Sequence, residues 1–430
     1  MPLTAAPTLA TDFAAAMARL GPFEPRPALA AAVSGGPDSL ALALLARDWV
    51  AAHGGTLTAL VVDHGLRESS AAEASLTLAR LAGQGIAARL IPLTTLANGP
   101  GLAARARTAR YAALEGACAG AGILHLLLGH HARDQAETLR MRAAAGSGPH
   151  GLAGMAALTE GEAVRRLRPL LAVPPGRLRA WLRQHDLEWV EDPSNRDLAT
   201  LRARLRAELD DADGTGPVVA ALVGEAARHG LARTTSDGRL AEELAAKVRL
   251  HPAGWAVLAG GPLSPEALSA LLCTVAGRRY PVARASVAAL AAQPRAATLG
   301  GARLLAAGRA GARGDWLVVR EEAAMQVPVE ARPGAVWDRR FRLSPAALPP
   351  AGMMLGALGG DAARLRQVRP DWLLPPDWPS AVLRTLPTLR LGGAVIAVPA
   401  LGYPNAACCH ALAVDFRPAL PLGGGAFLPI

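Results

Sequence analysis

Cysteine is scarce in this sequence, and no apolar segment is long enough to cross a membrane. The 430 residues include four cysteines, of which Cys118 and Cys273 stand alone and Cys408 and Cys409 are adjacent. This spacing excludes a disulfide framework and contains no C-x-x-C pair. Charge, proline or glycine interrupts every apolar run before the roughly 20 residues that span a bilayer. The first residues carry Asp12 and lack a basic segment, so we expect no secretory signal and a cytoplasmic protein.

Lysine is also nearly absent, although the chain is basic. Lys247 is the only lysine, yet Lys and Arg together number 45 against 35 Asp and Glu, which gives a formal charge of +10. Abundant Ala and Gly beside arginine are typical of GC-rich coding. The positive sign of the net charge is therefore informative about binding partners, whereas the use of arginine in place of lysine is not. A strongly positive chain favours a polyanionic partner such as a nucleic acid.

The sequence is globular and long enough for two or three domains, with 51% hydrophobic and 19% charged residues. Short apolar runs at 28–33, 57–62, 86–93, 123–129 and 163–171 alternate with helical patterns. This alternation predicts an α/β fold with a parallel, doubly wound sheet over residues 1–206. Residues 207–295 are Ala-rich and predict a helical middle domain. Residues 296–430 contain apolar runs joined by Gly turns and predict a small β-rich domain.

A loop of unusual composition, SGGPDS at 34–39, lies between the first predicted strand and a helix. Ligands of parallel α/β sheets bind at the carboxyl ends of the strands, and a helix N-terminus attracts anions. Two glycines let the backbone approach phosphate oxygens, and two serines add hydroxyl donors. The lysine of a Walker P-loop is missing. Asp38 would repel a phosphate unless a cation lies between them, which indicates Mg²⁺ and a pyrophosphate.

Further motifs follow this loop in a fixed order: VVDHGLRESS (61–70), ARTARY (106–111), GHHARDQAET (129–138) and WVEDPSNRD (189–197). Together they resemble the tRNA(Ile)-lysidine synthases, a family of PP-loop ATP pyrophosphatases. The resemblance implies ATP-dependent ligation of free L-lysine to C2 of the wobble cytidine, position 34, of tRNA(Ile) with a CAU anticodon. An adenylated cytidine is the intermediate, and lysidine, AMP and diphosphate are the products. The codon read changes from AUG to AUA.

The resemblance also implies roles for individual residues. It places ATP at Ser34, Gly35, Gly36, Pro37, Asp38, Ser39, Asp63, His64, Gly129 and His130, with Mg²⁺ held by Asp38 through the pyrophosphate. Asp38, Arg107 and Arg110 are the expected catalytic residues. Asp134 and Glu137 are expected to bind lysine, and Arg202, Arg204 and Arg206 the tRNA. The C-terminal domain is expected to hold the acceptor stem. The oligomeric state stays open, with a homodimer as one candidate.

Three positions depart from the family pattern. Arg133 stands where the family usually has an acid, Ala203 replaces an asparagine, and Ala103 occupies the place of a frequent acid. An arginine beside the proposed amine site would oppose a cationic substrate unless it pointed to phosphate or solvent.

Structural explanations compete with each assignment. The loop can be a Gly-rich turn with a Ser/Asp cap, and Arg107 and Arg110 can belong to a solvated helix. Asp63 can be a strand-end residue, and Asp134 and Glu137 simple helix N-terminal acids. Rival functions are a tRNA thiolase, an ammonia-dependent synthetase and a non-catalytic tRNA-binding protein. A thiolase usually needs a cysteine pair near the sheet, and Cys118 is the only cysteine in the predicted first domain.

Overall fold

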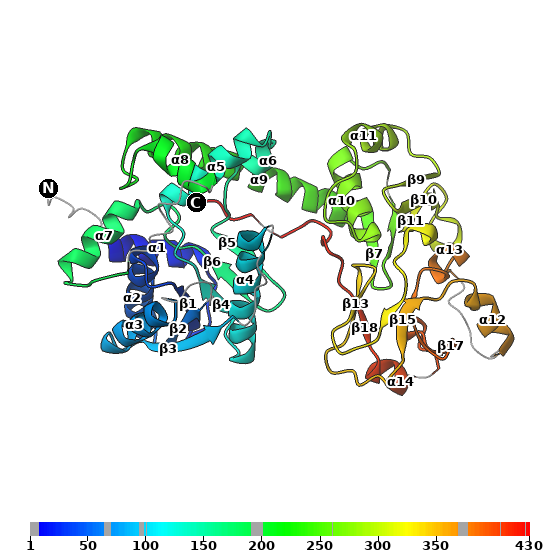
Figure 1. The fold of residues 1–430 in the computed structure, drawn as a ribbon. Helices are drawn as coiled ribbons and strands as arrows, with labels where there is room; N and C mark the ends of the chain where they lie inside the picture. Colours follow the sequence, from blue (N-terminus) through cyan, green and yellow to red (C-terminus); the bar gives the residue numbers. More distant parts are fainter. Residues whose placement is uncertain are drawn as a thin grey trace. The chain divides into compact units, whose positions relative to one another are not determined.

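The computed structural model describes residues 8–63, 70–93, 99, 101–190, 201–259, 261–368, 377–404, 406–425 and 427–430. The chain forms two compact units, which we describe separately (Figure 1). Unit 1 comprises residues 1–235 and 426–430, and unit 2 comprises residues 236–425. The division into 1–206, 207–295 and 296–430 stays a prediction. None of the described helices combines the length and apolar character that a membrane crossing needs.

Unit 1 is built on a six-stranded sheet in the order β3-β2-β1-β4-β6-β5. Its strands are β1 (Ala28–Val33), β2 (Thr56–Asp63), β3 (Ala87–Pro92), β4 (His125–Leu127), β5 (Leu158–Glu160) and β6 (Arg165–Leu167). All pairs are parallel except β5 with β6. The helices are α1 (Leu9–Leu20), α2 (Pro37–Ala52), α3 (Ser70–Gly83), α4 (Leu102–Gly120), α5 (Ala132–Ala144), α6 (Pro149–Leu152), α7 (Pro175–Gln184), α8 (Leu201–Leu209) and α9 (Pro217–Lys247), which continues into unit 2.

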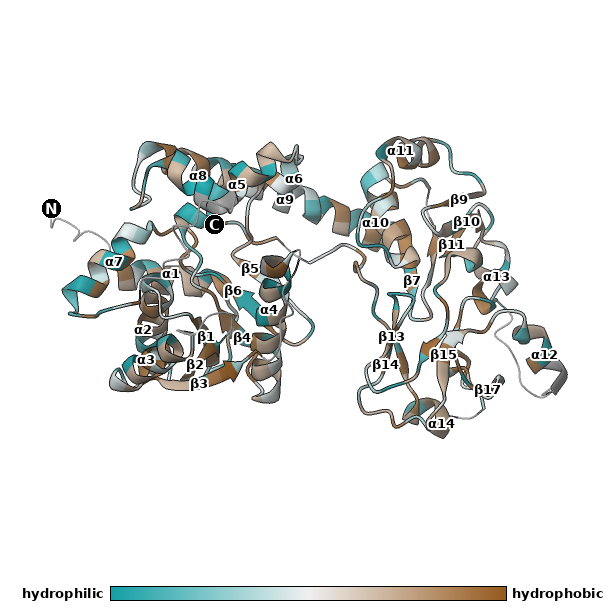
Figure 2. Cartoon of the chain, in the orientation of Figure 1, coloured by the Kyte–Doolittle hydropathy of each residue, from teal (hydrophilic) through white to brown (hydrophobic). Residues whose placement is uncertain are grey.

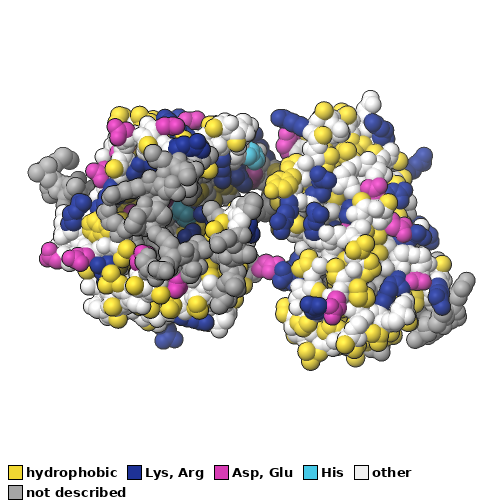
Figure 3. Space-filling view, viewed as in Figure 1, with side chains coloured by type: hydrophobic (Ala, Val, Ile, Leu, Met, Phe, Trp, Pro, Cys, Tyr) yellow, Lys and Arg dark blue, Asp and Glu magenta, His cyan; other side chains and the backbone are white. Residues whose placement is uncertain are grey.

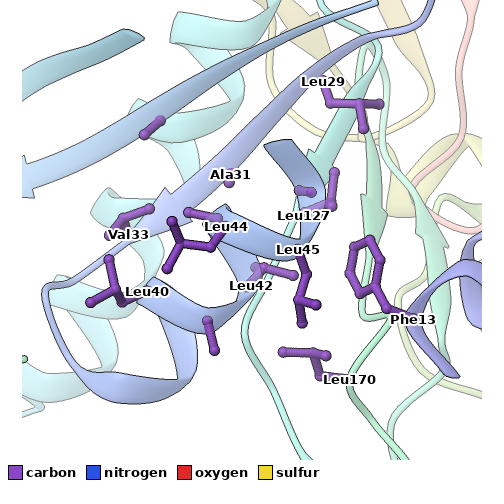
Figure 4. Close-up of a cluster of buried hydrophobic side chains, with 14 of the residues drawn as sticks. Phe13, Leu29, Ala31, Val33, Leu40, Leu42, Leu44, Leu45, Leu127 and Leu170 are labelled. Atoms are coloured by element: carbon purple, nitrogen blue, oxygen red, sulfur yellow. The ribbon is translucent and has the colours of Figure 1, made fainter. Parts of the chain in front are cut away.

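Helices cover both faces of this sheet, as the sequence predicts for a doubly wound fold. Along β1, Leu29, Ala31 and Val33 enter one apolar core with α1, α2 and α7. Ala30, between them, enters a second core with α4. Figure 4 shows the β1 side chains of the first core facing those of α2, with Phe13 of α1 alongside. The central strands are correspondingly brown in Figure 2, whereas α8 carries hydrophilic residues.

Residues 427–430 pack against unit 1, although they follow the residues of unit 2 in the sequence. Ala157 N donates to Leu428 O at 2.9 Å, and the Thr234 hydroxyl donates to Phe427 O at 2.8 Å. The Arg233 guanidinium lies 4.4 Å from the centroid of the Phe427 ring. Leu428 and Ile430 pack against the first core. This segment therefore extends the β5 edge of unit 1.

Unit 2 contains three antiparallel sheets, in the orders β7-β8-β11-β10-β9, β12-β15-β16-β17 and β13-β14-β18. Its strands are β7 (Val248–His251), β8 (Trp255–Leu258), β9 (Ala297–Leu299), β10 (Ala302–Ala306), β11 (Trp316–Arg320), β12 (Val329–Glu330), β13 (Val336–Trp337), β14 (Phe341–Leu343), β15 (Met354–Ala357), β16 (Pro387–Leu391), β17 (Ala394–Ala397) and β18 (Val414–Phe416). Its helices are α10 (Pro265–Ala276), α11 (Arg284–Ala292), α12 (Asp361–Val368), α13 (Ser380–Leu383) and α14 (Ala406–Ala411). The β-rich character predicted after residue 296 is confirmed, and β7 and β8 were not predicted.

Candidate functional site

A cavity of about 910 Å³ opens at the carboxyl ends of the central strands of unit 1. Its lining comes from the loop after β1, the end of β2, the segment after β4, and helices α4, α5 and α8. This is the edge at which parallel α/β sheets bind their ligands. Several predicted site residues line it together: Ser34, Gly36, Pro37, Asp38, Ser39, Arg110, Gly129, His130, Asp134 and Arg206.

The loop at 34–39 is held by its two serines. The Ser39 hydroxyl donates to Gly36 O at 3.1 Å and accepts from Ser34 N at 3.1 Å, and the two serine hydroxyls lie 3.2 Å apart. Gly35 has φ +83, and a Cβ there would lie 2.5 Å from the Thr77 hydroxyl oxygen. Only glycine fits both this backbone conformation and this close approach. These contacts and the positive φ of Gly35 therefore define the shape of the loop.

The N-terminus of α2 opens from this loop. Gly36 is its N-cap and makes no side-chain cap hydrogen bond, and Pro37 occupies the first helical position. A Cβ on Gly36 would meet no atom closer than 3.7 Å. The first N–H groups of a helix lack intrahelical partners and carry partial positive charge. The space beside Gly36 can therefore accept phosphate oxygens, as the sequence suggests.

Asp38 belongs to a chain of charged side chains that runs into α5. The His131 Nε2 atom lies 3.4 Å from Asp38 Oδ2 and 3.6 Å from Asp134 Oδ2. Asp134 also closes the N-terminus of α5, because its Oδ2 accepts from His131 N at 3.2 Å. Burial lowers the pKa of His131, but the charges of Asp134 and Asp38 outweigh burial, and the net pKa is raised above 6.5. A cationic His131 would thus stabilise both carboxylates.

The other oxygen of Asp38 fits a hard cation. Asp38 Oδ1 is buried and has no hydrogen-bond partner among the described residues. A carboxylate oxygen in this state is a ligand type that Mg²⁺ prefers. In the described part of the chain no three His, Cys, Asp or Glu side chains gather to hold a metal. A cation at Asp38 would therefore take further oxygen ligands from a bound nucleotide or water.

Glu137 meets arginines from two helices. Its side chain is fully buried, and Oε1 accepts from Arg206 Nε of α8 at 2.7 Å. Arg206 also lies 3.6 Å from Asp134 Oδ1, and Arg133 Nε lies 3.9 Å from Glu137 Oε1. Arg206, expected on a tRNA-facing surface, is thus directed at the two carboxylates expected to bind lysine. The structure brings these three predicted residues together in one cluster.

The two arginines of the ARTARY motif flank Tyr111 on α4. Arg107 donates to the Tyr111 hydroxyl at 3.3 Å, and its guanidinium lies 5.1 Å from the ring centroid. The Arg110 guanidinium lies 5.8 Å from the same centroid and lines the cavity, whereas the Arg107 side chain is largely exposed. Arg166 of β6 approaches the ring at 5.6 Å. Three guanidinium groups therefore lie near the Tyr111 ring, and those of them that line the cavity include Arg110.

The remaining predicted residues are placed unevenly. Asp63 ends β2 and accepts a hydrogen bond from the hydroxyl of Ser70, which lines the cavity. Arg204 is exposed on α8. His64 and the side chain of Arg202 lie outside the described residues.

Sequence reasoning missed Arg179 of α7, which lines the cavity and donates to Ala212 O at 2.7 Å and Asp213 Oδ1 at 2.6 Å. No local motif marks it, because its partners lie more than 30 residues away in the sequence.

Comparisons with known sequences and structures found several proteins that are similar to this chain. A family model described as a PP-loop domain matches residues 8–212. The chain is 42% identical over 291 residues to a tRNA(Ile)-lysidine synthase of Hyphomonas neptunium, covering 64% of this chain and 78% of that protein. It is 34% identical over 398 residues to that of Ruegeria pomeroyi, covering 89% and 90%. Among solved structures, the U34-tRNA thiolase NcsA of Methanococcus maripaludis is similar at 18% identity and TM-score 0.43, over 50% of this chain and 77% of that one.

Proposed function

Because the chain belongs to the family of tRNA(Ile)-lysidine synthases, we propose that it joins free L-lysine to C2 of the wobble cytidine in tRNA(Ile) with a CAU anticodon. ATP first adenylates the base and releases diphosphate, and the lysine amine then displaces AMP. A carbonyl oxygen on a pyrimidine is a poor leaving group, and AMP is a better one. The enzyme is thus an AMP-forming ligase that makes a carbon–nitrogen bond.

One observation carries this proposal: a single cavity combines an anion-binding loop, cations and buried acids. The loop at 34–39 and the N-terminus of α2 suit the phosphates of ATP. Arg110 can neutralise charge on the departing diphosphate. Mg²⁺, if bound at Asp38, would supply further neutralisation of that charge. Asp134 lines the cavity, and we assign the ammonium groups of lysine to its carboxylate and to that of the buried Glu137, which shares Arg206 with it.

A thiolase is disfavoured by the state of Cys118. This cysteine is the only one in unit 1 and is completely buried on α4. Burial, aided by the charge of Glu115, raises the pKa of its thiol to about 11. At pH 7 only about one molecule in 10⁴ would carry the thiolate that sulfur chemistry requires. Cys118 is better explained as a core residue.

The charge of the chain supports tRNA as the macromolecular substrate. The formal charge is +10, and Figure 3 shows Lys and Arg side chains spread over the visible face of unit 2. Phosphate contacts supply most of the affinity of such proteins for nucleic acids. We propose that Arg204 and unit 2 contribute to this binding and that the protein acts in the cytoplasm. A homodimer stays a prediction.

The decisive experiment supplies ATP, labelled lysine and a panel of tRNAs. We expect label only in tRNA(Ile) with the CAU anticodon, with AMP and diphosphate as co-products and lysidine in the nucleoside digest by mass spectrometry. Turnover that yields ADP, or label on another base, would refute the proposal.

The role of Asp38 can be tested with a matched control on the same helix. Asp38→Asn removes the carboxylate and should slow diphosphate release by about 100-fold or more, with tRNA affinity unchanged. Asp48→Asn alters an exposed carboxylate of α2 that pairs with the neighbouring Arg47, and this variant should retain the wild-type rate. Equal rates in the two variants would remove Asp38 from the catalytic residues.

A further inference from the structure

Arg133 stands where the family usually has an acid. Its side chain lines the cavity and also donates hydrogen bonds to backbone carbonyls of the protein. The guanidinium is largely buried, with 15% of the side chain exposed. NH2 donates to Arg206 O at 3.1 Å, and NH1 donates to Ala212 O at 3.4 Å. Arg133 thus joins the first turn of α5 to the end of α8 and to the turn that follows it.

The contact with α8 satisfies a specific need of that helix. Arg206 O is one of the last four carbonyls of α8 (Leu201–Leu209), which have no intrahelical partner. A cation near a helix C-terminus is favoured by the dipole, whereas a cation in the first turn of α5 is not. The position of Arg133 is therefore unfavourable for its own helix and favourable for α8.

A second arginine fixes the same turn from another helix. Arg179 of α7 donates to Ala212 O at 2.7 Å and to Asp213 Oδ1 at 2.6 Å. Gly176 N donates to Asp213 O at 2.9 Å. The turn after α8 is thus held from α5 and α7 together, and Ala212 O accepts from both arginines.

Arg206 is consequently fixed at two ends. Its carbonyl accepts from Arg133, and its guanidinium donates to Glu137 at 2.7 Å and lies 3.6 Å from Asp134. We propose that Arg133 is a positioning residue for the lysine site, which orients Arg206 and through it the carboxylates of Asp134 and Glu137. The inference rests on the proposed function, because it takes those two carboxylates as the lysine-binding pair.

An acid at this position could not serve in the same way. A carboxylate cannot donate to Arg206 O or Ala212 O, and it would repel Glu137 and the carbonyl end of α8. Arg133→Asp should therefore release α8 rather than restore the family pattern. Lysine can supply one ammonium donor where arginine supplies a fork, so Arg133→Lys should preserve part of the effect.

The test separates adenylation from lysine transfer. In Arg133→Ala we expect the KM for lysine to rise about tenfold, in line with the loss of hydrogen bonds from a charged donor. The rate of diphosphate release from ATP in the presence of tRNA should stay within twofold of wild type. The KM for lysine of Arg133→Lys should lie between those of wild type and Arg133→Ala. The matched control is Arg140→Ala, which removes a partly exposed arginine that links α5 to α8 through Glu208 at 3.9 Å and should change neither step.

Hydrogen exchange of α8 amides gives a readout that does not depend on lysine chemistry. Faster exchange in α8 of Arg133→Ala, with Arg140→Ala unchanged, is expected. A lysine KM within twofold of wild type, or a proportional loss of both steps, overturns the inference. If wild type transfers no lysine to tRNA, the proposed function fails. Unchanged α8 exchange in Arg133→Ala would then still separately refute the positioning role.

Discussion

Replacing Asp338 by asparagine should destabilise unit 2 strongly, because one buried carboxylate holds two arginines. Asp338 follows β13 and is 1% exposed, and Arg340 is fully buried. Arg320 donates to both carboxylate oxygens at 2.9 Å, and Arg340 Nε donates to Oδ2 at 2.8 Å. Gln326 N adds a bond to Oδ1 at 3.1 Å. These bonds join the sheet of β11 to the turn before β14.

The magnitude follows from the hydrogen bonds that asparagine cannot accept. Its NH₂ group faces two donors at either oxygen position, two arginines at Oδ2 or Arg320 and Gln326 N at Oδ1. Two hydrogen bonds are therefore lost, at least one of them from a charged donor and worth about 1.5–3 kcal/mol. Breaking a buried ion pair by removing one partner costs about 3–5 kcal/mol, so we expect a loss of about 4 kcal/mol. Asp338 has φ +52, a conformation that asparagine also tolerates, so backbone strain adds little.

The pH dependence provides a second measure of the same group. Burial raises the pKa of Asp338, but hydrogen bonds from Arg320 and the charges of Arg340 and Arg320 outweigh it, and the net pKa lies below 3.8. The folded-state pKa is depressed, so the stabilisation is present above 3.8 and is lost as pH falls through the lower value. Asp338→Asn should remove this part of the acid sensitivity.

Urea denaturation with hydrogen exchange resolved to unit 2 measures both effects. The control is Glu322→Gln, which breaks an exposed pair with Arg384 (2.6 and 2.8 Å) and should cost less than about 1 kcal/mol. ATP binding to unit 1 should be unchanged in both variants. A loss in Asp338→Asn no larger than in Glu322→Gln would refute the reasoning.

Two further predictions concern unit 1. Because the pKa of His131 is raised in the folded state, its contribution to stability is present below pH 6.5 and is lost as pH rises through the higher folded-state value. His131→Gln should therefore flatten the fall in Tm above pH 6.5. An unchanged slope of Tm against pH would assign the titration to another group. Deleting residues 427–430 removes the packing of Leu428 and Ile430 and the hydrogen bond to Ala157. We expect the free energy of unfolding of unit 1 to fall by about 2–4 kcal/mol. An unaltered Tm in thermal unfolding would contradict this prediction.

Much of the fold of unit 1 could be predicted, because its signals are local. The predicted run at 28–33 is β1, and its neighbours at 57–62 and 86–93 coincide with β2 and β3 within a few residues. β5 (Leu158–Glu160) was missed because it is short and exists only through pairing with β6. β7 and β8 were missed because their Ala-rich surroundings favour helix, and pairing of β8 with β11 outweighs that preference.

The site divides in the same way between local and distant contacts. The loop at 34–39 could be assigned because its glycines, serines and Asp38 are consecutive. The orientation of Arg206 could not be predicted, because its partner Glu137 is 69 residues away and the face on which α8 packs depends on tertiary structure.

Arg133 shows how distant contacts change the meaning of a substitution. From the sequence, an arginine beside the proposed amine site would oppose a cationic substrate unless it pointed to phosphate or solvent. In the structure, two of its N–H groups bond to the carbonyls of Arg206 and Ala212. Its charge lies against the carbonyl end of α8 and 3.9 Å from Glu137, where it offsets negative potential. The substitution is therefore compatible with lysine binding, because the guanidinium is engaged by the protein itself.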